Sequence, residues 1–356
     1  MTTKIAYFVS PHGFGHAARA SAIITALQRQ CDQFHFEIFT KMPAWFYTES
    51  GVMNFEYHDL LTDIGMVQKN ALVEDVHQTV EALNSLLPFT PQLIDRLAGQ
   101  LVEAGCRLVV CDIAPLGIAV AKAAGIPSVL IENFTWDWIY EVYIEQAPEI
   151  ADHAAYLKAL FDNADYHIQT EPICRRQPVD LTVGPISRIT REPISQVRAQ
   201  LGVPETAKMV VLSMGGTFWD YSFLEKIDPQ EAIYFVVAGS QPLEQRERLI
   251  SLPLGVYHPD LVNAADALIG KVGYSTLAEI YQAGTPFGYI ARSTFRESPF
   301  LVDYVEANMP CVQFDEVQLA NGSWISQLPR LLAFPKIKRP SANSADEVAG
   351  FISGLL

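Results

Sequence analysis

In the segment 1–183, hydrophobic residues form short continuous runs. Between these runs they recur with the spacing of an α-helix. Short apolar runs without alternation are typical of strands buried on both faces of a parallel sheet. The predicted strands are 5–9, 34–40, 54–57, 107–112, 128–131, 166–170 and 181–183. The predicted helices are 17–27, 91–104 and 117–124. Repeated strand and helix units of this kind predict a doubly wound α/β domain.

The same pattern restarts after a turn-rich, proline-containing stretch at 184–206, which holds a helical piece at 195–201. The predicted strands of the second half are 209–214, 233–238, 267–270 and 287–290, and its predicted helices are 218–227, 277–283, 300–307 and 344–356. We therefore expect a first domain at 1–183, an interdomain linker at 184–206, a second domain at 207–340 and a C-terminal helix at 341–356.

Residues 58–90 carry mixed character and no clear strand signal. An irregular helix is the favoured prediction for this segment, and a mobile substrate lid is the alternative.

The turn after the first strand carries the first candidate chemistry, because it holds His12 and His16 around Gly13 and Gly15. In α/β folds ligands bind where strands end and helices begin, and loops on rigid scaffolds carry function. A histidine placed there can act as a base at neutral pH. We interpret at least one of the pair as functional, with His16 as the candidate base.

Three other interpretations of this turn remain. The spacing Gly13-x-Gly15-x-x-Ala18 loosely matches a dinucleotide fingerprint, but the second strand ends in Thr40-Lys41 and offers no acidic residue for a ribose. A zinc pair would need a regular helix, which the glycines and the preceding proline disfavour. The plainest alternative is that both histidines only cap the turn and the following helix.

Two further features of the first half point to the same edge of the sheet. Asp112 ends the strand 107–112, where it either caps the next helix or accepts a hydrogen bond from a histidine ring and orients it. The run 133–140 is dense in aromatic residues, which either pack in the core or offer flat faces to a sugar ring.

In the second half, small-residue turns precede helices at Gly215-Gly216-Thr217 and at 273–276, and Lys271 lies beside the latter. Free N–H groups and the positive end of a helix dipole suit a phosphate at such turns. Each turn alone is a weak signal for a diphosphate, and the two together are stronger.

Composition narrows the functional classes. The chain is 49% hydrophobic and 18% charged, so a large core is expected, and its net charge of −15 argues against nucleic-acid binding. The five cysteines show no metal spacing and are expected to be reduced thiols. No apolar run approaches a membrane span, and no signal-type segment is recognisable, so the expected location is the cytoplasm.

The stretch from Ala265 to Ile280, with Ala283-Gly284-Thr285-Pro286 after it, resembles the donor-binding region of GT-B glycosyltransferases of the family-28 type. A closer likeness is to the glycosyltransferase-like N-terminal half of plant L-arabinokinases. The motifs that carry it are His12-Gly13-Phe14-Gly15-His16-Ala17-x-Arg19, Asn133-Phe134-Thr135-Trp136-Asp137, Gly270-Lys271-Val272-Gly273-Tyr274 and Glu297-x-Pro299-Phe300. This resemblance implies an α/β fold of the GT-B type, with two Rossmann-like domains that face each other across a cleft. It leaves open whether the C-terminal helix crosses back to the first domain.

The resemblance also implies roles for individual residues. His16 matches the family's base and Asp112 its strand-end partner, and Glu279 matches the carboxylate that binds the donor ribose. The remaining implied donor contacts are Arg188, Gly215, Gly216, Thr217, Lys271, Gly273, Ser275, Thr276, Arg296 and Glu297. Candidates on the acceptor side are His12, Phe14, Trp136 and Asp137. Related enzymes often carry glutamines or an aspartate where this chain has Arg296 and Glu297, so the resemblance does not fix the sugar.

The implied function is inverting transfer of a hexosyl group from a nucleotide-diphosphate sugar, with UDP the favoured nucleotide, to a hydroxyl of a small-molecule, lipid-linked or peptide acceptor. No Asp-x-Asp occurs in the sequence, so no metal and no cofactor besides the co-substrate is expected. Two alternatives stay open: a nucleotide-sugar epimerase or hydrolase on the same fold, and a non-catalytic nucleotide-sugar-binding protein.

Overall fold

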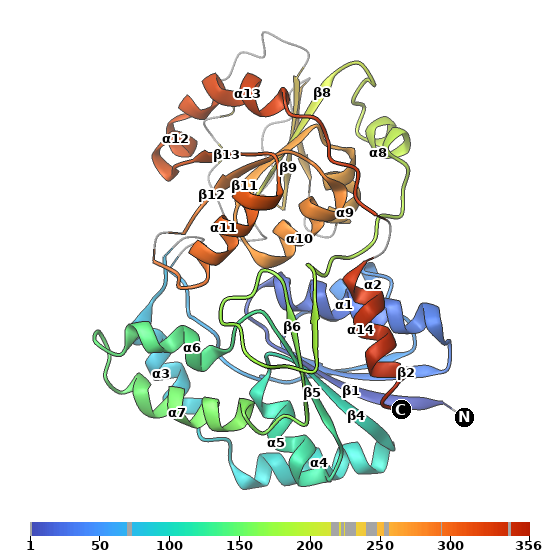
Figure 1. Cartoon of the computed structure of the whole chain (residues 1–356), viewed down its shortest axis with the longest axis vertical. Helices are drawn as coiled ribbons and strands as arrows, with labels where there is room; N and C mark the ends of the chain where they lie inside the picture. The colour runs from blue at the N-terminus through green and yellow to red at the C-terminus, as the bar shows by residue number, and fades with distance from the viewer. Residues whose placement is uncertain are drawn as a thin grey trace. The chain divides into compact units, whose positions relative to one another are not determined.

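A computed structural model describes residues 2–69, 73–214, 221, 224, 233–239, 248–252, 256–292, 294–340 and 343–356. The chain divides into two compact units. The first unit consists of Met1–Lys69, Glu74–Ser187 and Ala342–Leu356, and the second of Asn70–Val73 and Arg188–Ser341. Each unit is built around one parallel sheet with helices packed against it (Figure 1).

The sheet of the first unit has seven strands in the order β3-β2-β1-β4-β5-β6-β7, all parallel. Its strands are β1 (Thr3–Val9), β2 (Phe34–Thr40), β3 (Phe55–Asp59), β4 (Cys106–Asp112), β5 (Ser128–Glu132), β6 (Tyr166–Thr170) and β7 (Leu181–Val183). Its helices are α1 (Phe14–Gln30), α2 (Ala44–Glu49), α3 (Val76–Leu86), α4 (Pro91–Ala104), α5 (Pro115–Ala124), α6 (Trp136–Tyr140), η1 (Glu141–Tyr143), α7 (Ile150–Phe161) and α14 (Ser344–Ser353). The order reverses direction at β1 and β4, and the carboxyl ends of those two strands are therefore the expected place for a ligand.

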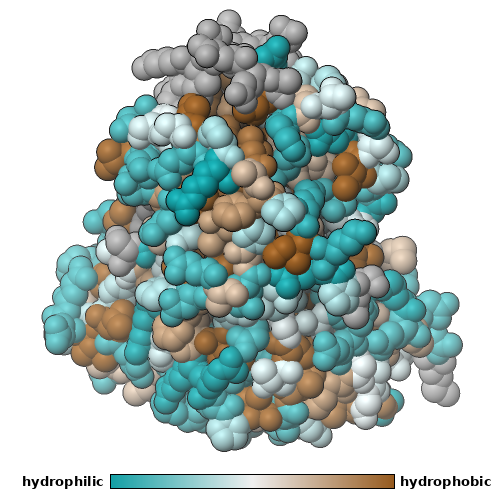
Figure 2. Space-filling model, turned by 45° about the horizontal axis from the view of Figure 1, so that its top comes forward, coloured by the Kyte–Doolittle hydropathy of each residue, from teal (hydrophilic) through white to brown (hydrophobic). Residues whose placement is uncertain are grey.

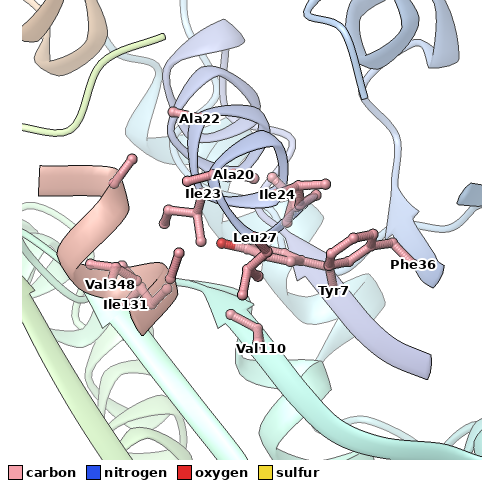
Figure 3. Packing of buried hydrophobic residues seen from close by; sticks show 14 of the residues in the cluster. Tyr7, Ala20, Ala22, Ile23, Ile24, Leu27, Phe36, Val110, Ile131 and Val348 are labelled. Atoms are coloured by element: carbon pink, nitrogen blue, oxygen red, sulfur yellow. The ribbon is translucent and has the colours of Figure 1, made fainter. Parts of the chain in front are cut away.

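Small side chains let α1 lie close to the sheet. Ala20 and Ile23 of this helix face Tyr7, Val110 and Ile131 on three neighbouring strands (Figure 3). The hydrophobic cluster continues into α14, whose Val348, Ala349 and Ile352 are buried with it. Helices α4, α5 and α7 cover the opposite face of the sheet (Figure 1).

The segment 58–90 is more regular than the sequence predicts. Strand β3 extends to Asp59, an extended stretch follows, and α3 is a regular helix that begins after Asp75, whose side chain accepts a hydrogen bond from the backbone N–H of Gln78. This N-cap fixes the start of the helix.

The sheet of the second unit has six parallel strands in the order β10-β9-β8-β11-β12-β13. They are β8 (Lys208–Ser213), β9 (Ile233–Ala238), β10 (Leu249–Leu252), β11 (Ala267–Lys271), β12 (Phe287–Ile290) and β13 (Cys311–Phe314). The helices are α8 (Ile194–Gln200), α9 (His258–Ala264), α10 (Tyr274–Ala283), α11 (Ser298–Asn308), α12 (Glu316–Asn321), η3 (Ser323–Gln327) and α13 (Leu328–Leu332). One hydrophobic cluster packs α8 to α11 on one face of this sheet, and a second packs η3 and α13 on the other.

The boundary between the units falls after Ser187, inside the stretch expected to be a linker. Residues 188–206 belong to the second unit, where α8 packs against α9. The C-terminal helix α14 belongs to the first unit and packs on α1. Arg29 of α1 also forms an ion pair of 2.7 Å with Asp346 of α14.

Among the residues that the structure describes, no helix is both long and apolar enough to cross a membrane. On the face shown in Figure 2, outside the grey atoms, hydrophobic residues lie in small groups among polar ones. All five cysteines are free thiols.

Candidate functional site

The turn between β1 and α1 brings His16 to the end of the neighbouring strand. Gly13 precedes the helix with φ of 72°, a left-handed conformation that a residue with a side chain rarely adopts. The helix then begins at Phe14, which places His16 in its first turn. Val9 and Asp112 are register partners at the carboxyl ends of β1 and β4. His16 Nδ1 lies 2.9 Å from Asp112 Oδ1, so the predicted pair is formed.

Arg19, one helical turn after His16, completes this arrangement. Its Nε and Nη2 donate to the two oxygens of Asp112 at 2.8 and 2.7 Å, and its Nη1 donates to Asn133 Oδ1 at 2.9 Å. Arg19 and Asp112 are 1% and 0% exposed, so the pair is fully withdrawn from water. A bidentate charged pair of this kind fixes the carboxylate in position as well as neutralising it.

Burial leaves the His16 ring neutral beside an ionised carboxylate. Burial acts to raise the pKa of Asp112, but the Arg19 guanidinium and the hydrogen bond from His16 outweigh burial and hold this pKa below its ordinary value. The pKa of His16 is lowered, chiefly by burial and also by Arg19, although Asp112 acts in the opposite direction. The site therefore contains an ionised Asp112 and an uncharged imidazole at neutral pH.

The tautomer of His16 follows from its partner. An ionised carboxylate only accepts hydrogen bonds, so Nδ1 carries the hydrogen and Nε2 carries the lone pair. Within the described part of the chain, no residue hydrogen-bonds His16 Nε2. The residue is 8% exposed, and the geometry of its ring suits acceptance of a proton at Nε2.

Aromatic residues form the surroundings of the two histidines. The ring of Trp136 lies edge-on to His12 at 5.0 Å and to His16 at 6.3 Å between centroids. Phe134 contacts His16 in the same way at 6.2 Å. The predicted acceptor-side residues His12 and Trp136 are therefore next to His16.

The other two acceptor-side candidates lie elsewhere in the first unit. Phe14 packs on Trp45 and Phe46, with ring centroids 5.8 and 5.0 Å away. Asp137 lines a separate cavity beside β5 and α7.

Asp63 is a buried carboxyl group near this site that the sequence did not indicate. Its Oδ1 accepts a hydrogen bond of 2.9 Å from Ser10 Oγ, the residue directly after β1. Burial raises the pKa of Asp63 to about 8, although contacts with Ser10 and Trp136 oppose this, and the charge of Asp112 adds to it. Asp63 is therefore mostly protonated at neutral pH, unlike Asp112.

The second unit gathers a charged cluster around Glu279, which lies on α10. Arg188 Nε donates to Glu279 Oε1 at 3.0 Å, and His258 Nδ1 lies 2.7 Å from Glu279 Oε2. The other ring nitrogen of His258 lies 3.1 Å from Ser213 Oγ at the end of β8. The two predicted donor residues Arg188 and Glu279 are thus in direct contact.

Burial and these partners have opposite effects on Glu279. Burial acts to raise the pKa of Glu279, but Arg188 and His258 outweigh it and hold the pKa below its ordinary value. Tyr257 lies beneath the arginines, with the guanidinium carbon atoms of Arg188 and Arg191 at 5.1 and 3.8 Å from its ring centroid. The result is an ionised carboxylate with basic and aromatic neighbours, a combination that suits polar and aromatic parts of a nucleoside.

The start of α10, beside this cluster, holds four of the other predicted donor residues. Lys271 ends β11, Gly273 is the N-cap of α10, and Ser275 and Thr276 lie in the first turn. Arg296 and Glu297 lie directly before α11, where Glu297 is buried. Gly215, Gly216 and Thr217 lie outside the described residues.

A group of possible metal ligands lies at a different place. In the described ranges, His35, Glu37 and Glu56 bring ligand atoms within 4.8 Å of one another. They lie near the amino ends of β2 and β3, the edge of the sheet opposite to His16. Glu37 already binds Lys4 at 3.0 Å and His58 at 2.8 Å, which satisfies its charge without an ion.

Solved structures with this architecture define the class of fold. The chain is similar to CalG4, the calicheamicin glycosyltransferase, with a TM-score of 0.66 and 14% identity over 100% of this chain and 99% of that one. Glycosyltransferase VinC in complex with dTDP has a TM-score of 0.63 and 13% identity over 99% of both chains. UGT89C1 of Arabidopsis thaliana in complex with UDP has a TM-score of 0.58 and 11% identity over 99% of this chain and 91% of its own. The chain has the GT-B fold, as the sequence predicts.

One curated relative resembles the chain in sequence. L-arabinokinase of Arabidopsis thaliana is 27% identical over 354 residues, which cover 97% of this chain and 33% of that protein. The chain thus spans about a third of the length of this relative, and the predicted likeness to L-arabinokinases is confirmed. No protein-family model matches the chain.

Proposed function

We propose that the protein is an inverting, metal-independent glycosyltransferase that moves a sugar from a nucleotide-diphosphate sugar to an acceptor hydroxyl. The observation that carries this proposal is the neutral His16 imidazole, held by an ionised Asp112 and carrying its lone pair on Nε2. The GT-B fold and the Glu279 cluster support a nucleotide-sugar donor.

The acceptor reacts in a single displacement. His16 Nε2 takes the proton of the acceptor hydroxyl while the hydroxyl oxygen forms a bond to the anomeric carbon of the donor sugar. The bond from that carbon to the diphosphate oxygen breaks, and the nucleoside diphosphate leaves. Attack from the side opposite to the leaving group inverts the configuration of the anomeric carbon. Asp112 stabilises the imidazolium that forms, and Arg19 holds Asp112 in position.

The second unit binds the donor in this proposal. Glu279 accepts hydrogen bonds from the ribose hydroxyls, since each carboxylate oxygen can accept more than one. The backbone N–H groups at the start of α10, together with Lys271 and Arg188, stabilise the charge of the leaving diphosphate. UDP is the favoured nucleotide, and the absence of a metal requirement and the cytoplasmic location stay predictions.

A turnover assay tests the proposed function. A panel of nucleotide sugars is first screened by thermal shift, because a bound donor raises the melting temperature by mass action. The donor that binds is then incubated with candidate acceptors in buffer with EDTA and followed by proton NMR. We expect a glycoside whose anomeric configuration is opposite to that of the donor. Retained configuration, or activity that EDTA abolishes and Mg²⁺ or Mn²⁺ restores, would contradict the proposed mechanism.

The same experiment separates the alternatives. An epimerase or hydrolase would convert the donor without any acceptor, and the NMR spectrum of donor and protein alone would show the product. A non-catalytic binding protein would give a thermal shift and no product with any acceptor.

Glu279→Gln tests the donor site. We expect the Kd for the nucleoside diphosphate to rise by roughly 10- to 100-fold, because the substitution removes one hydrogen bond to a charged group. Isothermal titration calorimetry measures this, and Glu316→Gln, an exposed substitution on α12, is the matched control. An unchanged Kd in Glu279→Gln would remove this residue from the donor site.

A further inference from the structure

A second carboxylate–imidazole pair lines a cavity of about 370 Å³ in the first unit. Glu132 ends β5 and His167 lies on β6, and His167 Nε2 lies 2.8 Å from Glu132 Oε1. Gln169 Nε2 donates to the same oxygen, also at 2.8 Å. The volume falls within the range of small-molecule sites in proteins.

The contacts of His167 hold Glu132 in position and leave neither ring nitrogen available to move a proton. The other ring nitrogen of His167 lies 3.4 Å from Gln177 Nε2, so both nitrogens of the ring are engaged. Glu132 Oε1 has two donors, whereas Oε2 accepts no hydrogen bond from any residue that the structure describes. Glu132 is 2% exposed and lines the cavity, so Oε2 is a deeply placed acceptor for a ligand.

The rest of the lining combines polar and apolar groups. Phe134 and Phe161 contribute ring surfaces, and Asp137 contributes a second carboxyl group, whose pKa is raised chiefly by burial. Arg175 and Gln177 lie at the exposed rim and offer donors. Hydroxyl-rich molecules with apolar C–H faces match such a mixture of acceptors, donors and aromatic surface.

Charged ligands match the cavity less well. The innermost charge is the Glu132 carboxylate, which repels a phosphate or another anion. Lys158 of α7, which also lines the cavity, is bound to Asp162 at 2.6 Å. An organic cation would have to compete with His167 and Gln169, which already donate to Glu132.

We propose that this cavity is a binding site for one neutral sugar ring, separate from the His16 site. Phe134 connects the two sites, because it lines the cavity and also contacts His16 edge-on, with ring centroids 6.2 Å apart. The sugar hydroxyls donate to Glu132 Oε2, and the C–H face of the ring lies against a phenylalanine. The site goes beyond the proposed transfer reaction, because it binds its ligand without any nucleotide.

Binding measured without a donor tests this site. The full chain is titrated with neutral hexoses and pentoses, and with inorganic phosphate and putrescine as charged probes, by saturation-transfer NMR and calorimetry. We expect at least one neutral sugar to bind and its Kd to rise by roughly tenfold or more in Glu132→Gln, because the charged acceptor is lost. Glu103→Gln, an exposed substitution on α4, should leave this Kd unchanged.

Further variants locate the binding. His16→Ala should retain sugar binding, whereas loss in His16→Ala with retention in Glu132→Gln would place the sugar elsewhere and overturn the inference. Saturable binding of only phosphate or putrescine, or of no probe, would also overturn it. Phe161→Ala changes a second residue of the lining and should also weaken sugar binding. It serves as the test if Glu132→Gln fails to fold. Sugar binding at this cavity does not require transfer. A negative result here therefore leaves the proposed function standing, and failure of the proposed function leaves this binding site standing.

Discussion

His16→Ala is expected to lower the rate of sugar transfer by roughly 10²- to 10⁴-fold, the usual contribution of a general base. The affinity for the donor should stay unchanged, because the donor residues of the proposal lie in the second unit. The fold should survive, since Arg19 still pairs with Asp112 through two hydrogen bonds when the imidazole is removed. Single-turnover kinetics with saturating donor measures the chemical step directly.

A matched substitution separates a chemical role from a general effect. His77→Ala removes an exposed imidazole from α3 and should leave turnover unchanged. Asp112→Asn provides a second test, because an amide can donate to Nδ1 and thereby favour the tautomer with its hydrogen on Nε2. We expect this variant also to lose transfer. Turnover of His16→Ala at the rate of the unmodified protein would show that another group accepts the proton.

Asp63 is expected to make the stability of the first unit depend on pH. The pKa of Asp63 is about 8 in the folded chain and 3.8 as its ordinary value, so between these pH values the folded state binds one proton more than the unfolded state. The stabilisation that this group contributes is therefore present below pH 4 and falls as the pH rises to about 8. A shift of roughly four pKa units corresponds to about 6 kcal/mol, at about 1.4 kcal/mol for each unit.

Asp63→Asn removes this titration while keeping an oxygen that Ser10 can bind. We expect the variant to unfold at higher urea concentration than the original protein at pH 8, and the difference to shrink by pH 5. Asp95→Asn, an exposed substitution on α4, controls for the loss of a negative charge. Parallel pH dependence of the unfolding midpoints of the original protein and Asp63→Asn would mean that Asp63 is ionised in the folded state throughout.

Most strands could be predicted because burial on both faces leaves an uninterrupted apolar run. The ranges of β2, β6, β7, β9 and β12 agree with the predicted ones residue for residue. Helix α4 was equally clear, because Pro91 starts it and Gly105, in the left-handed conformation, ends it. Several of the missed elements, such as β10, β13 and α9, are short, and their few residues show too little periodicity to identify them. Helix α7, with 12 residues, was also missed.

The candidate site was predictable where a charged residue ended a strand. Asp112 is such a case, and the structure pairs it with His16 as expected. Arg19 was overlooked as a site residue, although a lone arginine in the alanine-rich start of a buried helix needs a buried partner.

Asp63 and His258 carried no local signal. Both lie in segments without clear periodicity, and their partners Ser10 and Glu279 are distant in sequence. Only the tertiary structure brings such pairs together, so reasoning from local patterns cannot find them.

The position of α14 sets an order on how the chain folds during its synthesis. This helix closes the hydrophobic cluster around α1, yet it leaves the ribosome only after all of residues 188–341. At roughly 5–20 residues per second the delay is on the order of ten seconds. During that interval the apolar face of α1 that later packs on α14 is exposed. A nascent chain stalled within the second unit would therefore be a natural client for a chaperone.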